Sequence, residues 1–249
     1  NNLTIAGTVS GAGSLVKQGS GNLELSGTNT YSGGTTLESG TLTLANGSSL
    51  GLGSLTVKSG EVVLKTGFVS TQSLLQNSAN QNTVITGDGT FASANVTNGT
   101  LLINGKITTA SAAVNNGTLL VNGTLTSPLT IGSTGKLGGL GTIIGNVAVN
   151  GILSPGNSPA ILTVNGNVDQ NAGSVLEIDI DGSTAGNGAG FYDQVVASGN
   201  YNIAASNTTL TAKLRGITGS ANNTFVPTIG QSFEIVKANA VNGTFATYT

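Results

Sequence analysis

The sequence predicts an all-β fold in which short strands stack as successive coils of a solenoid. Three observations support this: 39 of the 249 residues are glycine, strand-favouring Val, Thr and Leu are abundant, and a short unit repeats along the chain. Gly and Asn supply the positive φ angles of tight turns at little cost, which favours short strands over helices. A hydrophobic fraction of 37% separates the chain from disordered sequences, so we expect it to fold.

The two clearest copies of the repeat are Asn98–Gly105 and Asn116–Gly123, which differ at one residue and are shifted by 18 positions. A third copy begins at Gly135, and the second glycine of each copy recurs with the same spacing of 18 residues. Units of the form Gly-x-apolar-x-apolar also begin, at shifts of 16 to 20, at Gly21, Gly40, Gly60 and Gly151. A drifting period is typical of coils whose turns absorb length changes. Residues 66–95 blur the pattern and are expected to contain a turn with insertions.

Side chains alternate across each predicted strand. Leu119 and Val121 should face inward, and Thr118, Leu120 and Asn122 outward. Each coil can bury its apolar face only by stacking, at about 1.5–3 kcal/mol per aliphatic side chain. The expected interior columns are Leu101, Leu119 and Leu137, and beside them Ile103 and Val121.

The repeated asparagines Asn98 and Asn116 occupy predicted turns. Asn tolerates the left-handed αL conformation, and its amide can form hydrogen bonds along a stack. We therefore expect these asparagines to have a structural role and to bind no ligand.

The period is lost from about residue 170. Val175–Ile180 alternates as a strand, and residues 181–190 form a Gly, Asn and Ala loop. Further strands are predicted at 192–197, 208–215 and 232–237, with Pro227 and Gly230 marking a turn. We predict two regions, β-helix coils over 1–168 and a hairpin-rich cap over 169–249 that closes the end of the solenoid.

Several functions are excluded by composition. Without Cys or His, the chain has no disulfide, no thiolate or histidine metal site, and no Ser-His-Asp or Cys-His machinery. No apolar run approaches the roughly 18 residues of a transmembrane helix. The sequence opens directly on strand-like residues, as expected of a trimmed or processed chain. Nucleic-acid binding needs clustered cations, whereas the basic residues are scattered singly: Lys17, Lys58, Lys65, Lys106, Lys136, Lys213, Arg215 and Lys237.

The remaining chemical candidates are acidic. Glu177, Asp179 and Asp181 alternate on one strand face, and paired carboxylates can cleave glycosides or bind Ca²⁺. We favour a solvated outer face opposite buried apolar residues, because the chain has few aromatic residues to stack on sugars. The segment 87–90 (Gly-Asp-Gly-Thr) is interpreted as a hairpin-type turn. The segment 156–159 (Gly-Asn-Ser-Pro) is interpreted as a rigid corner. We assign no catalytic, cofactor-binding or metal-binding residue.

Three stretches carry a family resemblance. Residues 11–42 contain Gly-x-Gly-x-Leu-x-Lys-x-Gly-x-Gly-x-Leu, then Gly-x-Asn-Thr-Tyr-x-Gly-Gly-Thr-Thr and Gly-Thr-Leu, and resemble the passenger-associated transport repeat of bacterial autotransporters. Residues 151–164, with Gly-Ile-Leu-Ser-Pro-Gly-Asn-Ser-Pro, are similar to a segment found late in such passengers. The third stretch is similar to the conserved passenger end: Tyr192, Asp193, Thr224 to Pro227, Gly230, Phe233 to Val236 and Gly243 to Phe245.

This resemblance implies a right-handed parallel β-helix at the bacterial outer membrane or cell surface, secreted by the type V route. It implies that the C-terminal region is an autochaperone-like core that folds first outside the cell. It also implies one partner, the protein's own C-terminal translocator barrel, encoded beyond Thr249. No cofactor is implied. The expected function is therefore a non-enzymatic stalk that promotes its own secretion.

Three alternatives remain open. The β-helix surface could act as an adhesin that binds host cells, matrix or neighbouring bacteria, including by self-association. An ice-binding face would need a flat Thr array, which Thr41, Thr43, Thr124 and Thr126 suggest but Leu120 and Asn122 interrupt. A polysaccharide-acting enzyme would use Glu177 and Asp179.

Overall fold

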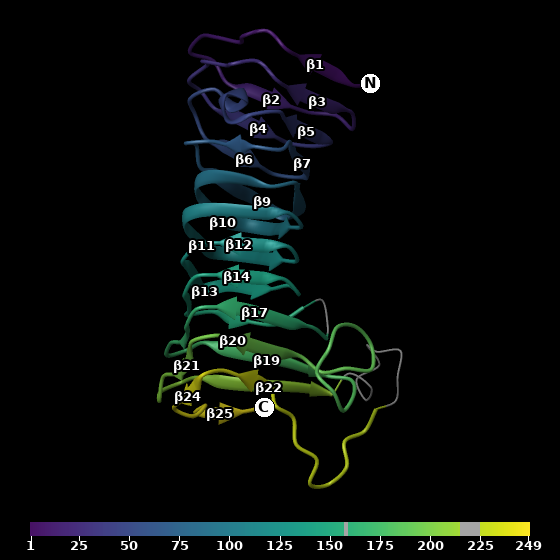
Figure 1. Cartoon of the computed structure of the whole chain (residues 1–249), viewed down its shortest axis with the longest axis vertical. Coiled ribbons are helices and arrows are strands. Elements are labelled where there is room, and N and C mark those ends of the chain that lie inside the picture. The colour runs from purple at the N-terminus through teal and green to yellow at the C-terminus, as the bar shows by residue number, and fades with distance from the viewer. Residues whose placement is uncertain (157–158, 215–224) are drawn as a thin grey trace. The chain divides into compact units, whose positions relative to one another are not determined.

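The computed structural model describes residues 1–156, 159–214 and 225–249. Strands account for 54% of the chain and helix for 2%, so the prediction of an all-β parallel solenoid is confirmed. The chain divides into two compact units. Unit 1 comprises Asn1–Leu119 and Gly123–Ser127, and unit 2 comprises Leu120–Asn122 and Pro128–Thr249. Both units are built from β-strands (Figure 1).

Within the described ranges, the single helical element is a short 3-10 turn, η1 (Gly47–Leu50), which Asn46 caps. The first strands are β1 (Leu3–Ile5), β2 (Leu15–Lys17), β3 (Asn22–Leu25), β4 (Thr35–Leu37), β5 (Thr41–Leu44), β6 (Leu55–Val57), β7 (Gly60–Leu64), β8 (Phe68–Val69), β9 (Leu74–Thr86), β10 (Gly89–Ile103), β11 (Lys106–Val121) and β12 (Thr124–Thr126). They are followed by β13 (Leu129–Gly138), β14 (Thr142–Ile144), β15 (Val147–Val149), β16 (Ile152–Leu153), β17 (Ile161–Asn165), β18 (Val168–Gln170), β19 (Val175–Ile180), β20 (Gln194–Ala197), β21 (Asn200–Ile203), β22 (Thr209–Leu214), β23 (Val236–Lys237), β24 (Ala240–Asn242) and β25 (Thr247–Tyr248).

In unit 1 the strands stack in parallel columns. One column contains β1, β3, β5, β7 and the end of β9, and it places Leu23, Leu42, Val62 and Ile85 in register. A second contains β2, β4, β6 and the start of β9. Each interior Leu or Val therefore contacts its equivalents in the neighbouring coils, as the repeat predicted.

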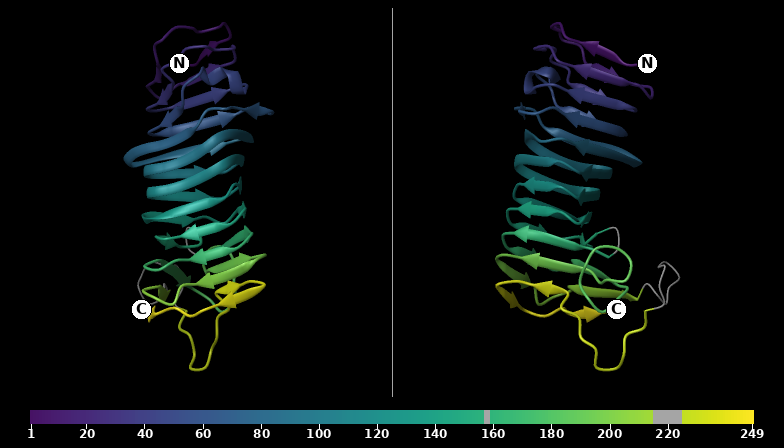
Figure 2. Two further views of the ribbon diagram at one scale, coloured as in Figure 1. Left: turned by 90° about the vertical axis from the view of Figure 1, so that its left-hand side faces the viewer. Right: turned by 45° about the vertical axis from the view of Figure 1, so that its right-hand side comes forward.

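Unit 2 contains three such columns, which Figure 2 shows from two further sides. They are β13–β16–β19–β22–β25, β13–β15–β18–β21–β24 and β14–β17–β20–β23. All of these pairings are parallel. The expectation of a hairpin-rich cap over 169–249 is therefore wrong for the described strands. The coils continue, but insertions lengthen them: Asn167 and Asn200 occupy equivalent positions although they lie 33 residues apart.

Of the strands predicted in the C-terminal region, one is confirmed and the others differ in their bounds. The strand at 175–180 is confirmed as β19, and residues 181–190 form a loop. The strand predicted at 192–197 starts two residues later as β20, and that at 232–237 is reduced to the two residues of β23. The strand predicted at 208–215 corresponds to β22, although residue 215 lies outside the described residues, as does Thr224. The strands β18, β21, β24 and β25 were not predicted.

The interior positions expected from the repeat are confirmed. Leu101, Ile103 and Val121 are fully buried, as is Leu137, and Leu119 is 3% exposed. Leu120 and Asn122 are half-buried on the opposite side of their strand. Two-residue alternation alone therefore separated the inward from the outward side chains.

The glycines that recur in step lie where coils approach most closely. A Cβ atom at Gly105 would overlap the carbonyl oxygen of Gly87, and one at Gly123 would overlap that of Gly105. These corners exclude every side chain, which explains why the glycine period survives where the strand sequence varies.

The asparagine prediction is half right. Asn116 Nδ2 donates to Asn98 Oδ1 at 2.8 Å, and Asn98 Nδ2 donates to Asn77 Oδ1 at 3.3 Å, so a side-chain ladder along the stack is confirmed. Neither Asn98 nor Asn116 adopts αL, because the positive φ angles fall on the glycines that follow them, 75° at Gly99 and 102° at Gly117.

The insertion expected within residues 66–95 lies in β9. Asn77 pairs with Asn98, and Asn82 pairs with Thr100, so the extra residues between positions 77 and 82 form an irregularity opposite a single residue of β10. The coil grows at its corner while both flanking strand segments keep their register, as a solenoid permits.

Tyr201 offers a direct test of the interior. Its side chain is fully buried, and in the described part of the chain its hydroxyl has no hydrogen-bond partner. Burial also raises the pKa of this phenol strongly. Because an unsatisfied buried hydroxyl is costly, Tyr201→Phe should leave the free energy of unfolding unchanged or raise it by about 1 kcal/mol in urea titrations.

The matched control for Tyr201 is Tyr31→Phe. The Tyr31 hydroxyl is also buried but lies 2.5 Å from Thr35 Oγ1, so its loss should lower the free energy of unfolding by about 1 kcal/mol. Equal destabilisation by both substitutions would contradict the assignment of Tyr201.

Candidate functional site

The acidic strand β19 was the main chemical candidate. Glu177 and Asp179 are half-buried and alternate with the buried Leu176 and Ile178. Glu177 forms two ion pairs: Oε2 lies 2.8 Å from Lys136 Nζ, and Oε1 lies 3.2 Å from Lys213 Nζ. Both carboxylate oxygens are therefore occupied by lysines. This geometry opposes a role as a free acid or base.

The two lysines were visible in the sequence, but their meeting at Glu177 was not. Lys136 lies in β13, two coils before β19, and Lys213 lies in β22, one coil after it. Lys213 is in register with Asp179 and reaches across to Glu177. Lys136 and Lys213 lie 41 and 36 residues from Glu177 in the sequence, and the stacking of coils brings all three into one cluster on the outer face.

The Glu177 cluster predicts a pH dependence. Burial tends to raise the pKa of Glu177, but hydrogen bonds and charge from Lys136 and Lys213 outweigh it, so the pKa lies below 4.5. A folded-state pKa below the unfolded value stabilises the protein above about pH 4.5, and this contribution is lost as pH falls through the folded pKa. Unfolding of wild type and Glu177→Gln in urea should differ at pH 7 and converge towards pH 3.

Glu38 supplies the control for that measurement. Hydrogen bonds from Gln18 and Lys58 also lower its pKa, but the Glu38 side chain is more exposed than that of Glu177, so Glu38→Gln should have a smaller effect that disappears in high salt. If Glu177→Gln and wild type differ equally at both pH values, the ion pairs do not set the pKa.

Asp181 departs from the prediction of a solvated face. Its side chain is 1% exposed, and Oδ2 accepts a hydrogen bond from Gly190 N–H at 3.1 Å. Asp181 and Gly190 are the first and last residues of the loop that the sequence predicted over 181–190, so this hydrogen bond closes the loop. In the described residues, no group of three or more acidic side chains could hold a metal ion.

Asp193 has a structural importance that the sequence did not reveal, because it was named only as part of the resemblance to the conserved passenger end. It is fully buried, with Oδ1 accepting from Ala160 N–H at 2.5 Å and Oδ2 from Asp179 N–H at 2.7 Å. Asp193 thus fastens the end of the 181–193 loop to β19 and to the start of β17. An Asp directly after an aromatic residue was its only sequence signal.

The segment 156–159 forms part of the same region. Pro159 is buried, and its carbonyl oxygen accepts Gly188 N–H at 2.8 Å, so the 181–193 loop packs on this corner. Asn157 and Ser158 lie outside the described residues. The segment 87–90 is also a corner between coils, because β9 and β10 on either side pair in parallel with neighbouring strands; the hairpin interpretation is wrong.

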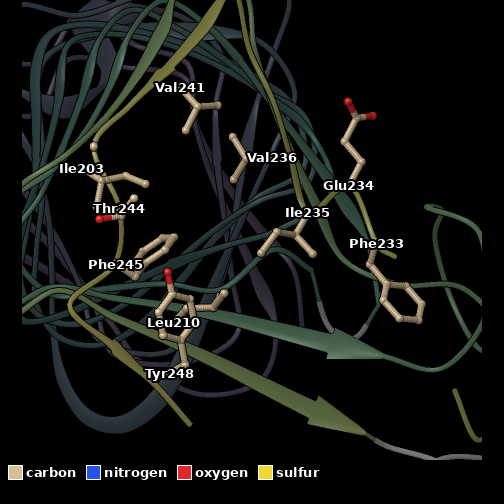
Figure 3. A pocket seen from close by; sticks show the side chains of 11 residues that line it. Ile203, Leu210, Phe233, Glu234, Ile235, Val236, Val241, Thr244, Phe245 and Tyr248 are labelled. Carbon is tan, nitrogen blue, oxygen red and sulfur yellow. The ribbon is translucent and has the colours of Figure 1, made fainter. Parts of the chain in front are cut away.

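The final coil of unit 2 contains an apolar pocket of about 300 Å³. Figure 3 shows Ile235, Val236 and Phe245 among the side chains around it, together with Ile203, Leu210, Phe233, Glu234, Val241, Thr244 and Tyr248. Close by, Phe233 packs edge-on against Tyr192 at 5.3 Å between ring centroids and against Phe225 at 6.3 Å. The long 225–235 connection is thereby joined to the end of the 181–193 loop.

The motif residues of 11–42 form polar contacts within unit 1. The buried Lys17 Nζ donates to the carbonyl oxygens of Gln18, Gly19 and Ser39, which fixes the turns of two coils. The buried Asn29 accepts Val9 N–H at 2.8 Å and donates to Ser49 O at 2.8 Å, joining three successive coils. These residues therefore stabilise the stack of coils.

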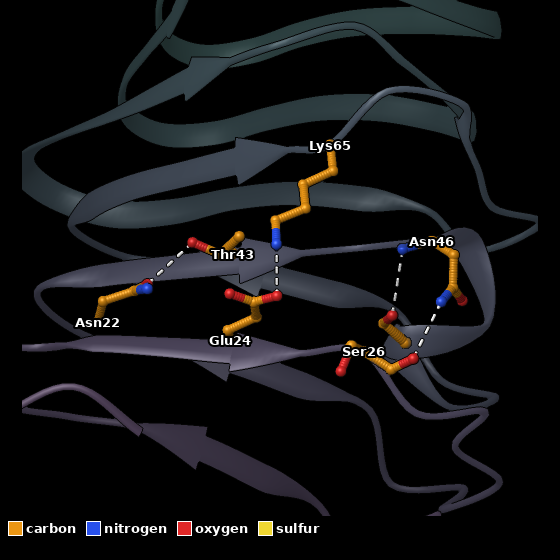
Figure 4. A network of polar contacts seen from close by, with 7 residues as sticks. Asn22, Glu24, Ser26, Thr43, Asn46 and Lys65 are labelled. Atoms are coloured by element: carbon orange, nitrogen blue, oxygen red, sulfur yellow. Dashed lines mark hydrogen bonds and ion pairs between the residues drawn. The ribbon is translucent and has the colours of Figure 1, made fainter. Parts of the chain in front are cut away.

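Neighbouring polar contacts also join different coils of unit 1 (Figure 4). Thr43 donates to Asn22, and Lys65 pairs with Glu24 two coils away. Thr43 is only 7% exposed, so the Thr41 and Thr43 row is not an open hydroxyl array of the kind that ice binding requires.

Comparison with known proteins agrees with this description. Residues 15–44 match the family model described as passenger-associated-transport-repeat. This match supports an autotransporter passenger region. No curated protein matches the chain. Among the described residues, no helix combines the length and apolarity needed to cross a membrane.

Proposed function

We propose that the chain is a non-enzymatic passenger segment that forms a β-helical stalk at the bacterial surface and promotes its own folding during secretion across the outer membrane. The passenger repeat and the β-solenoid fit an autotransporter passenger stalk, and the repeat family implies a secreted or cell-surface location. The partner in this proposal is the protein's own translocator barrel.

The observation that carries the folding role is the construction of unit 2. In addition to the stacking of its coils, unit 2 has the 181–193 loop, which the buried Asp181 and Asp193 hold in place. Tyr192, which is 7% exposed, packs against Phe233 of the following long connection. These contacts give unit 2 a core that does not depend on coil repetition. Once folded, its strands offer parallel edges on which further coils can stack.

The test is surface display of the full-length protein with Phe233→Asp. A charge placed between the rings of Tyr192 and Phe225 should separate the long connection from the loop, because an unpaired charge is costly to bury. We expect several-fold less passenger on intact cells, measured by antibody labelling against total expression.

Ile229→Asp is the matched control for display. Ile229 lies in the same connection and its replacement introduces the same charge, but its side chain is fully exposed, so display should be unaffected. Normal display of Phe233→Asp, or equal loss in both variants, would count against a folding role for unit 2.

Adhesion is a second candidate, favoured by one specific observation. A depression on the outer face of unit 1 gathers polar side-chain groups from adjacent coils that have no partner among the described residues.

A further inference from the structure

We propose that the depression lined by Gly67, Phe68, Asp88, Gly89, Thr90, Lys106 and Thr108, here called the 88/106 depression, binds one neutral sugar unit of a surface glycan. The proposal gives a ligand class to the adhesion candidate and rests on that candidate. It does not depend on the role of unit 2 in secretion.

The coil stack builds this site from two neighbouring corners of unit 1. Asp88 and Thr90 are separated by one residue, as are Lys106 and Thr108 one repeat of 18 residues later. Between the latter two, Ile107 is fully buried, so Lys106 and Thr108 lie on the outer side of β11. The result is two short rows of polar side chains on adjacent coils.

Asp88 is held in place while one oxygen stays available. Its Oδ1 accepts the Lys106 backbone N–H at 2.8 Å, which fixes the carboxylate at the edge of the depression. In the described part of the chain, Oδ2 of Asp88, the Lys106 ammonium and the hydroxyls of Thr90 and Thr108 have no partner. A carboxylate acceptor, an ammonium donor and two hydroxyls are thus free together.

This set of groups selects the ligand class. Asp88 repels phosphate and sulfate, and Lys106 repels simple cations, so a neutral ligand is favoured. Sugar hydroxyls both donate and accept, and can satisfy the carboxylate, the ammonium and the threonines at once. The volume of about 250 Å³ falls below the range of pockets for drug-sized ligands, as expected for a single sugar unit.

One exposed apolar side chain beside the depression suits the carbon-bound hydrogens of a sugar ring. Gly89 and the edge of Phe68 contribute to the lining, but Phe68 is only 1% exposed and packs inward against Phe91. Val69, the strand partner of Thr90, is 64% exposed and extends this surface with an apolar side chain. A shallow site of this kind should bind single sugars weakly, on the order of millimolar, and gain strength only by multivalent contact.

The experiment uses the ¹⁵N-labelled 249-residue chain titrated with methyl glycosides of mannose, galactose and N-acetylglucosamine. At least one should produce saturable amide shifts at Gly67, 88–90 and 106–108. Asp88→Asn keeps an oxygen for the Lys106 N–H but replaces the free acceptor by a donor. It should weaken binding by about tenfold, as should Lys106→Met.

A threonine pair separates binding from general surface effects. Thr108→Val removes a hydroxyl inside the depression and should weaken binding, whereas Thr126→Val removes its register partner one coil further along, outside the lining, and should not. The proposal is overturned if no glycoside gives saturable shifts, if Asp88→Asn binds like wild type, or if free glycine gives the same shifts as the sugars. Because display plays no part in this assay, its outcome is independent of the Phe233→Asp result.

Discussion

Replacing Asp193 by alanine is expected to lower the free energy of unfolding of unit 2 by about 2–6 kcal/mol, since two backbone N–H groups lose the hydrogen bonds that this buried carboxylate accepts. These are the amides of Ala160 and Asp179, at 2.5 and 2.7 Å from the two carboxylate oxygens. Water cannot replace the carboxylate readily, because Asp193 is fully buried. The measurement is urea unfolding followed by far-ultraviolet circular dichroism.

Two further variants sharpen the Asp193 result. Asp193→Asn keeps one acceptor but turns an amide donor towards a backbone N–H, so it should also be strongly destabilising. Asp169 lies on the outer face of the same unit, where it accepts Asn202 Nδ2 at 2.7 Å, and Asp169→Ala should cost less than about 1 kcal/mol. Similar losses for Asp169→Ala and Asp193→Ala would show that the buried amides do not depend on this carboxylate.

Leu176→Ala should cost about 2–5 kcal/mol, the usual range for emptying a fully buried leucine site. Leu176 is in register with Leu153 of the preceding coil and Leu210 of the next, so the cavity would loosen both neighbours. In a stack of coils the effect should stay local. Hydrogen exchange should therefore accelerate in β16, β19 and β22, and little in unit 1.

Leu140→Ala is the control for Leu176→Ala. Leu140 belongs to the same unit and loses the same atoms, but it is 45% exposed, so its replacement should change the free energy of unfolding little. Exchange that accelerates uniformly through both units after Leu176→Ala would refute local, nearest-neighbour stability.

The coil repeat was predictable because its physical constraints are local. Alternation of side chains identified Leu101, Ile103 and Leu119 as interior residues, and the glycine corners tolerate no Cβ. The match of residues 15–44 to a passenger repeat agrees with the motif seen in the sequence. The boundary between 168 and 169 and the autochaperone role stay predictions.

The hairpin cap was mispredicted for an identifiable reason. Insertions such as the 181–193 loop remove self-similarity from the sequence without disturbing the columns, since Val168 still pairs with Tyr201 and Asn200 with Ala240. Local patterns identify strands, but the partner of a strand 33 or 40 residues away depends on how the intervening chain folds.

Composition and two-residue alternation are properties of neighbouring residues, so they were enough to identify an all-β solenoid without cysteine or histidine chemistry. Which distant side chains meet is known only from the folded chain. Lys136 and Lys213 occupy both oxygens of Glu177, Asp193 fastens a loop to two strands, and Asp88 joins Lys106 in one depression. Each of these contacts follows from the register of the coils, which places residues many positions apart side by side. A local sequence pattern does not contain that register.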